Sequence, residues 1–193
     1  MSKVKTAAKR LERADRKVTH KAAAKHDTPA MRVAATVGEL ADQPPLIALS
    51  AATLVLGLVL RRRSVAEAGA RMLASHLLAT AAKEVVKRSV DRTRPHSVKK
   101  GHSYKLEPGG DRSHHYSSFP SGHTAGAVAV ARAAARVWPD RTPALSLAAA
   151  GAGAIQLPIA KHYVGDVLAG AAIGLASEWV VDAVVQAAAG GPE

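Results

Sequence analysis

The residues Phe119-Pro120-Ser121-Gly122-His123 lie where a long polar loop meets an apolar, helix-forming run. Proline, serine and glycine at such a junction predict a helix start, whose first backbone N–H groups have no partner within the helix. Those groups and the positive end of the helix dipole favour a bound anion such as phosphate, and glycine permits close approach to the backbone. His123 follows at once and can give or take a proton at that anion. Taken alone, the same residues are also typical of an ordinary capped helix with a surface histidine.

Two further clusters carry compatible chemistry. Lys87 and Arg94 are separated by six residues at the end of a helix-like run, and they supply cations. His162 and Asp166 are four residues apart, which on a helix or tight turn places them on one face, so that the carboxylate can orient the imidazole. Cations, backbone donors, an acid and a carboxylate-backed nucleophile together are what phosphoryl transfer requires.

The three clusters resemble the motifs of the type 2 phosphatidic acid phosphatase family, which shares its helical core with vanadium haloperoxidases and bacterial class A acid phosphatases. Lys-six residues-Arg-Pro and Pro-Ser-Gly-His stand unaltered at 87–95 and 120–123. In the third motif the histidine and aspartate match, but the preceding Ser-Arg positions hold Ile155 and Gln156. The resemblance covers roughly residues 65 to 185. It implies an all-α, multi-pass membrane bundle of about five or six helices.

The resemblance also implies roles for single residues. His162 would attack phosphorus to form a phosphohistidine, and Asp166 would hold its ring. His123 would protonate the leaving oxygen and later activate water. The phosphate would be bound by Lys87, Arg94, Ser121 and Gly122. No metal or other cofactor is expected.

The departure in the third motif bears on activity, because relatives use that arginine to bind the phosphate. Loss of one transition-state donor can cost roughly 3 to 4 kcal/mol. Gln156 can donate one neutral hydrogen bond, and we hypothesise that Lys161 or Arg112 restores the charge. Two functions therefore stay open: a membrane lipid phosphatase acting on a phosphomonoester or pyrophosphate, and a catalytically weakened or inactive relative that binds lipid phosphate.

Composition bounds the alternatives. A chain of 193 residues suits one domain with a single helical core. The absence of cysteine excludes disulfides and thiolate metal sites. A net charge of +12 suits an anionic membrane surface or nucleic acid, but only 3% aromatic residues argue against a base-stacking platform. A basic binding module that uses the N-terminal arm is the alternative of a different class, although no nucleic-acid partner is expected.

The chain divides into a basic N-terminal arm or surface helix at 1–27 and a single helical phosphatase domain at 28–190. The arm is either solvated or held against anionic lipid headgroups. Within the domain, residues 95–119 form an active-site loop that acts as a lid or entrance. Four histidines in that loop lack the carboxylate-supported spacing of a metal site.

Apolar runs indicate a protein of the cell membrane that crosses it more than once. The most apolar run, 46–60, reaches about 24 Å and ends at three arginines, as a short span or a buried helix would. An amphipathic helix over 28–43 precedes it, and Gly170 and Gly174 suit close helix contact. Because successive helices alternate in direction, the three motifs should meet at one end of the bundle. The other helices are expected over 65–87, 124–137, 144–160 and 163–188.

Overall fold

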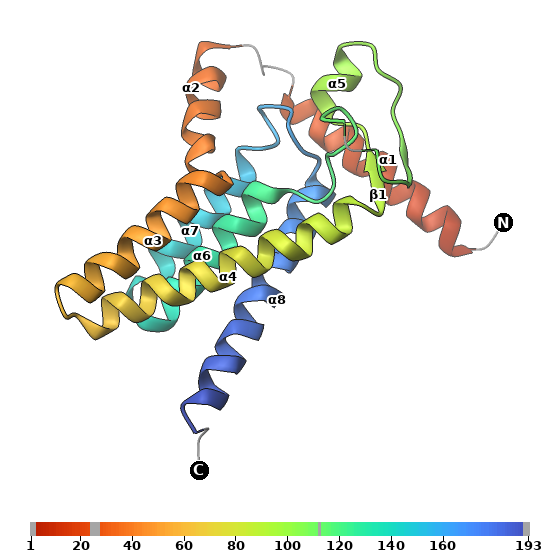
Figure 1. Cartoon of the computed structure of the whole chain (residues 1–193). Helices are drawn as coiled ribbons and strands as arrows, with labels where there is room; N and C mark the ends of the chain where they lie inside the picture. Colours follow the sequence, from red (N-terminus) through yellow and green to blue (C-terminus); the bar gives the residue numbers. More distant parts are fainter. Residues whose placement is uncertain (1–2, 24–27, 112, 191–193) are drawn as a thin grey trace.

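The computed structural model describes residues 3–23, 28–111 and 113–190, and its architecture is a helical bundle with one two-stranded ribbon (Figure 1). The all-α prediction is therefore confirmed. In chain order the elements are α1 (Lys3–Ala22), α2 (Pro29–Gly38), η2 (Glu39–Ala41), α3 (Gln43–Val59), α4 (Arg63–Lys87), β1 (Val90–Arg92), α5 (Pro95–Lys99), β2 (Leu106–Pro108), α6 (Gly122–Val137), η3 (Pro139–Arg141), α7 (Thr142–Ala154) and α8 (Val164–Ala188).

The bundle is built around α6, which packs against α3, α4, α7 and α8. Its middle position follows from its small side chains, because alanine and glycine let four neighbours approach one helix. A Cβ atom added at Gly170 of α8 would lie 2.4 Å from the carbonyl oxygen of Ser121, and one at Gly174 would lie 2.5 Å from that of Ala125. The close contact predicted for this glycine pair is confirmed, and it fixes α8 against the start of α6.

Local capping explains where the second and third helices begin. The Thr28 hydroxyl accepts a hydrogen bond from the backbone N–H of Met31 (3.3 Å), and the Asp42 carboxylate accepts one from Gln43 (2.8 Å). Two prolines follow in the first turn of α3, where a missing N–H costs little. The chain bends by 49° between α2 with η2 and α3. As a result α2 tips away from the bundle (Figure 1).

By length and composition, α8 is the one helix in the described ranges that could cross a bilayer unaided. The bent pair formed by α2, η2 and α3 would qualify as a second if it is counted as one span. Of the other bundle helices, α7 is apolar but only 13 residues long, and α4 and α6 carry charged residues. Some of this charge is paired at the end of the bundle far from the ribbon, where Arg71 bonds Asp182 at 2.7 Å and Arg136 bonds Glu178 at 2.7 Å.

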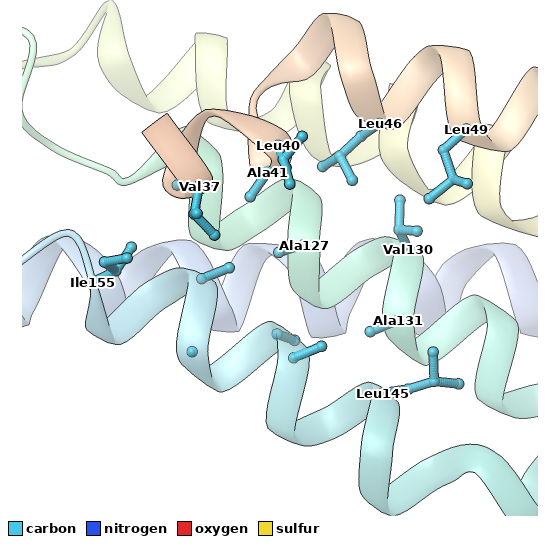
Figure 2. Close-up of a pocket in the computed structure, with 15 residues that line it drawn as sticks. Val37, Leu40, Ala41, Leu46, Leu49, Ala127, Val130, Ala131, Leu145 and Ile155 are labelled. Carbon is cyan, nitrogen blue, oxygen red and sulfur yellow. The ribbon is translucent and has the colours of Figure 1, made fainter. Parts of the chain in front are cut away.

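An apolar groove of about 530 Å³ opens on the side of the bundle between α3 and α7, with α6 as its floor. Figure 2 shows side chains from all these helices directed into it, with Val37 and Leu40 at the end nearest α2. Residues lining the groove include Leu46, Leu49, Ala127, Ala131, Leu145 and Ile155. A second apolar groove of about 460 Å³ lies on the other side of α7, against α6 and α8.

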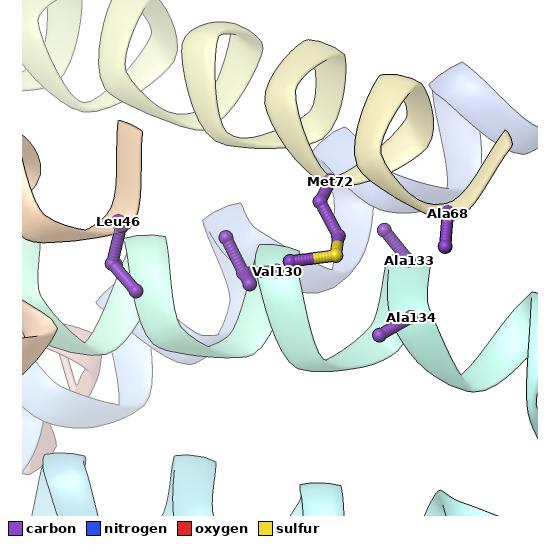
Figure 3. Close-up of a cluster of buried hydrophobic side chains, with 6 residues drawn as sticks. All are labelled: Leu46, Ala68, Met72, Val130, Ala133 and Ala134. Carbon is purple, nitrogen blue, oxygen red and sulfur yellow. The ribbon is translucent and has the colours of Figure 1, made fainter. Parts of the chain in front are cut away.

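The buried core lies between α3, α4 and α6. It consists of a few large side chains set among alanines, as Figure 3 shows: Leu46, Ala68, Met72, Val130, Ala133 and Ala134. The thioether of Met72 fills the space beside Val130, which suits a flexible side chain in a gap between closely spaced helices. The core is therefore held by close backbone approach more than by large side chains.

Candidate active site

The three sequence motifs meet at one end of the bundle. Lys87 ends α4, His123 lies in the first turn of α6, and His162 lies in the turn before α8. The rings of His123 and His162 lie edge to face, with centroids 6.4 Å apart and planes inclined at 60°. The charges of Arg94 and Lys87 act on the His162 ring, so both cations lie within its electrostatic reach. The convergence expected from the alternation of helix directions is thus present.

His162 is buried and held in one tautomer. Its Nδ1 lies 2.8 Å from the carbonyl oxygen of Ser118, and a carbonyl can only accept, so Nδ1 carries the proton and donates. The Nε2 atom is then left with its lone pair. Burial lowers the pKa of His162 to about 4; the nearby Asp166 carboxylate opposes the shift and the cation of Arg94 adds to it. The ring therefore stays neutral, the form a nucleophile needs.

Asp166 supports this ring indirectly, whereas the sequence led us to expect direct contact. Its Oδ2 lies 3.7 Å from His162 Nδ1, too far for a hydrogen bond. Instead, Oδ2 accepts hydrogen bonds from the Ser118 hydroxyl (2.5 Å) and the Tyr163 backbone N–H (2.8 Å). Ser118 thus bonds the aspartate through its side chain and the histidine through its carbonyl. Sequence reasoning missed this role because a backbone carbonyl leaves no signature in a motif.

Arg92 is the second residue that the sequence analysis missed. Its Nη1 donates to Asp166 Oδ1 (2.7 Å), its Nη2 donates to Asp15 of α1 (2.7 Å), and its guanidinium lies over the Tyr163 ring at 4.1 Å. Burial alone would lower the pKa of Arg92, but the Asp166 and Asp15 carboxylates outweigh it and raise that pKa. The available signal was an arginine two residues before Arg94, inside the spacer of the first motif.

The start of α6 has the features of an anion site, with one donor fewer than expected. The Ser121 hydroxyl caps the helix, accepting from the Thr124 hydroxyl (2.9 Å) and backbone N–H (3.4 Å). The Ser121 backbone N–H is taken by the carbonyl oxygen of Asp166 (3.0 Å). The N–H groups of Gly122 and His123, as first-turn donors, have no carbonyl of their own helix to bond.

Cations border this helix start. Arg94 is fixed by its own loop, donating through Nε to the His114 carbonyl (2.9 Å) and through Nη2 to the Ser117 carbonyl (3.2 Å). Lys83, one turn before Lys87 on α4, was also missed. A Cβ atom at Gly122 would lie 3.3 Å from Lys83 Nζ, so the glycine lets this ammonium approach the beginning of α6.

Two of the residues considered as replacements for the third-motif arginine bond other groups of the protein. The Gln156 amide is fully buried and donates one hydrogen bond to the Ala152 carbonyl of α7 (3.2 Å). The Lys161 ammonium is paired with the Glu39 carboxylate of η2. Arg112 lies outside the described residues. Position 156 therefore holds a buried neutral amide bonded to the last turns of α7, and its contact with phosphate stays a prediction.

A carboxylate pair lies beside His123. Glu39 and Asp42 each place an oxygen 3.9 Å from His123 Nε2, and one ligand atom from each of the three lies within 4.8 Å of the others. This is the spacing of a potential cation site. The ammonium of Lys161 already pairs with Glu39, so one of the two carboxylate charges of this cluster is neutralised within the protein.

The segment over 95–119 carries more structure than a plain loop. It contains α5 and β2, and β2 pairs with β1 in an antiparallel ribbon beside the site. Its histidines contact one another: the rings of His102 and His115 stack at 4.3 Å, and His115 Nδ1 lies 3.1 Å from the Ser97 hydroxyl. In its described residues the segment is therefore folded beside the site, and its role as a lid or entrance stays a prediction.

Fold and site together define a class: an α-helical bundle that sets two histidines and several cations around a helix start at one end. Comparison with known proteins agrees. The family model of the PAP2 superfamily matches residues 68–189, and the chain belongs to that superfamily. No curated protein matches the chain.

Two solved structures share the fold. The crystal structure of a transmembrane PAP2-type phosphatidylglycerolphosphate phosphatase from Bacillus subtilis is 20% identical, with a TM-score of 0.58 over 91% of this chain and 86% of that chain. The crystal structure of LpxE from Aquifex aeolicus is 19% identical, with a TM-score of 0.59 over 86% of this chain and 92% of that chain.

Proposed function

We propose that this protein is a membrane phosphatase that hydrolyses a phosphomonoester or pyrophosphate carried by a lipid, through a phosphohistidine at His162. The observation that carries the proposal is the tautomer of His162. Because Ser118 fixes the proton on Nδ1, the Nε2 atom of His162 keeps its lone pair for attack on phosphorus, and the centroid of the His123 ring lies 6.4 Å from that of His162. Two such rings at the start of a helix suit attack at one side of a phosphorus atom and departure at the other.

The proposed reaction has two steps, and each proton that is transferred in the first step is restored in the second. In the first, Nε2 of His162 bonds phosphorus as the bond to the leaving oxygen breaks, and protonated His123 gives that oxygen its proton. In the second, His123 takes a proton from water while the hydroxide attacks phosphorus, which releases inorganic phosphate and restores neutral His162. Lys87 and Arg94, with the N–H groups of Gly122 and His123, would stabilise the phosphoryl oxygens.

Support for a lipid substrate comes from the apolar groove between α3 and α7. Gly38 lines the end of this groove near α2. It directly precedes Glu39, whose carboxylate lies 3.9 Å from His123. Ala127, one turn after His123 on α6, lines the groove floor. If the phosphate of a lipid is held at His123, the aliphatic chain of that lipid could therefore lie in the groove. The two solved relatives with this fold include a transmembrane phosphatidylglycerolphosphate phosphatase, which is in keeping with this substrate class.

The expected location is the cell membrane, with several helices crossing it and the site at one surface. The spans would include α8 and the α2–α3 pair, which meet the length and composition test, and also the more polar α4 and α6 that pack between them. Charges on those helices are paired within the bundle, as between Arg71 and Asp182, which reduces their cost in lipid.

Release of inorganic phosphate from purified, reconstituted protein tests the proposal. The panel should contain phosphatidate, phosphatidylglycerol phosphate and a polyprenyl pyrophosphate, with His162→Ala as the inactive control. Wild-type turnover on at least one lipid, lost in His162→Ala and accompanied by a phosphorylated histidine in the wild type alone, is the expected result. Equal release by both proteins would refute the mechanism.

The second candidate is a weakened or inactive relative that binds lipid phosphate without hydrolysing it. The engaged amide of Gln156 favours it, because that position offers the phosphate no charge. Gln156→Arg discriminates: if the site is merely weakened, the variant should gain about 10- to 100-fold in kcat/KM. Binding of lipid phosphate by wild type and variant, with no release from either, would favour the binding protein.

A further inference from the structure

Helix α1 docks on the active site through a polar face. Although α1 belongs to the basic N-terminal segment, one of its faces is half-buried or buried. The residues of this face are Glu12, Asp15, Arg16 and Thr19. Arg16 lies over the Tyr104 ring at 4.0 Å. The Thr19 hydroxyl accepts a hydrogen bond from the Val164 backbone N–H (3.4 Å). The helix is therefore attached to the turn that joins His162 to α8.

Asp15 is the central contact of this docking. One carboxylate oxygen accepts from the Gly165 backbone N–H (3.1 Å), and the other accepts from Arg92 Nη2 (2.7 Å). Arg92 in turn bonds Asp166, which bonds Ser118, whose carbonyl fixes His162. A continuous chain of hydrogen bonds thus joins α1 to the imidazole. Removing α1 would leave one side of a buried guanidinium unpaired, which is costly and favours rearrangement.

The other faces of α1 suit a membrane surface. Leu11 and Val18 are 72% and 55% exposed, and they share one side of the helix with exposed Ala7, Ala14 and Ala22. Exposed cations flank one side of that stripe: Arg10, Lys17 and Lys21. An apolar stripe with a basic flank is the pattern of a helix lying in the interface of an anionic leaflet.

The position of α1 agrees with that pattern. It contacts Val164 and Gly165, the first turn of α8, the helix long and apolar enough to cross a bilayer by itself. The end of a membrane helix lies at the interface, and α1 crosses that end of the bundle (Figure 1).

We propose that α1 is an interfacial helix that couples the anionic membrane surface to the active site through the Asp15–Arg92–Asp166 chain. Adsorption of the stripe and its basic flank holds α1 in the docked position, and the docked Asp15 fixes Arg92 and thereby the His162 ring. The ligand is the headgroup region of an anionic leaflet, distinct from the substrate phosphate. This coupling rests on the proposed phosphatase function for its readout in turnover, but the docking itself can be measured without substrate.

Turnover in two kinds of vesicle tests the coupling. Full-length protein is reconstituted in phosphatidylcholine alone or with phosphatidylserine, at one low mole fraction of lipid phosphate. We expect kcat to be about fivefold or more higher with phosphatidylserine. Both Asp15→Asn and the pair Leu11→Ser with Val18→Ser should bring the ratio of the two kcat values close to one. A ratio like the wild type's in either variant would overturn the proposal.

Two controls identify the ligand. Lys100→Gln removes an exposed cation of the same end of the molecule outside α1, and it should keep the wild-type ratio. Glycerophosphoserine, the soluble headgroup without chains, should not raise kcat in neutral vesicles. If it does, α1 binds a free anion and the surface is not required, which contradicts the proposal.

Hydrogen exchange separates failure of the coupling from failure of the phosphatase function. The Gly165 amide is bonded by Asp15, so its exchange should slow when phosphatidylserine is present, in the wild type and in His162→Ala alike. Asp15→Asn should abolish that protection. If the exchange rate of the Gly165 amide is the same with and without phosphatidylserine, the coupling is refuted, whatever the turnover. Protection without any phosphate release would refute only the enzymatic assignment.

Discussion

At the scale of single residues, the site depends on partners that carry no charge of their own. Ser118 is buried between Asp166 and His162 and contacts both, through its hydroxyl at 2.5 Å and its carbonyl at 2.8 Å. The aspartate therefore fixes the position of Ser118, whose backbone carbonyl fixes the ring. This arrangement differs from a direct carboxylate–imidazole pair, because the imidazole proton is bonded to a neutral acceptor.

Ser118→Ala tests this indirect support. The variant keeps the carbonyl but loses a hydrogen bond to a buried carboxylate, a contact worth about 1.5 to 3 kcal/mol. We expect kcat to fall about 10- to 100-fold with little change in KM, measured as phosphate release. Ser103→Ala, at an exposed position of the same segment, should leave kcat unchanged. A normal kcat in Ser118→Ala would show that Asp166 acts on the ring by another route.

The ionisation of His162 predicts a pH effect with a definite sign. Burial holds its pKa near 4, and the positive charge of Arg94 contributes to the lowering. Arg94→Gln removes that charge, so the pKa of His162 should rise. The acid limb of the pH profile of kcat/KM should then move to higher pH. The maximum of kcat/KM should also be lower than in the wild type.

Arg94→Lys serves as the matched variant, since it keeps the charge and should keep the acid limb in place. The ionisation of the substrate phosphate is common to both variants and cancels in the comparison. An acid limb at the same pH in Arg94→Gln and Arg94→Lys would show that this cation does not act on the nucleophile.

At the scale of elements, the sequence predicted what depends on helix direction and failed where contacts cross the chain. Alternating helices had to bring Lys87, His123 and His162 to one end, and they do. The pairing of Asp15 with Arg92 joins residues 77 positions apart. The docking face of α1 is polar, so its pattern is that of a solvated face and no periodicity marks it. The engaged amide of Gln156 was equally hidden, because a motif gives a position and not the direction of a side chain.

The grooves beside α7 predict how chain length affects activity. Ala131 of α6 lines both grooves, so Ala131→Trp would fill space that an aliphatic chain needs. We expect KM for a long-chain lipid phosphate to rise about tenfold, with a smaller effect on a short-chain analogue. Leu147→Trp on α7 is the control, because Leu147 is 75% exposed and lines neither groove. Equal changes in KM for long and short chains would argue that the grooves hold no substrate.

At the scale of the whole molecule, the position of α1 bears on which membrane surface carries the site. The sequence alone left this open, since three arginines at 61–63 mark the end opposite the site while the loop over 95–119 is also basic. The contacts of Asp15 with Gly165 and Arg92 put the basic helix at the active-site end. That end then carries the larger cluster of cations: Lys9, Arg10, Arg13, Arg16, Lys17, Lys21, Lys99, Lys100 and Lys105.

The positive-inside rule therefore predicts a cytoplasmic active site, since the end with more lysine and arginine near the membrane is retained inside. The chain has no cysteine, so single introduced thiols can report on each end. Ser103→Cys lies in the segment over the site, and Asp140→Cys lies at the opposite end in η3, where Asp140 is exposed. In intact cells a membrane-impermeant maleimide should label Asp140→Cys alone, and Ser103→Cys should react only after permeabilisation. The reverse pattern would place the site on the outer surface and bring α1 against the outer leaflet.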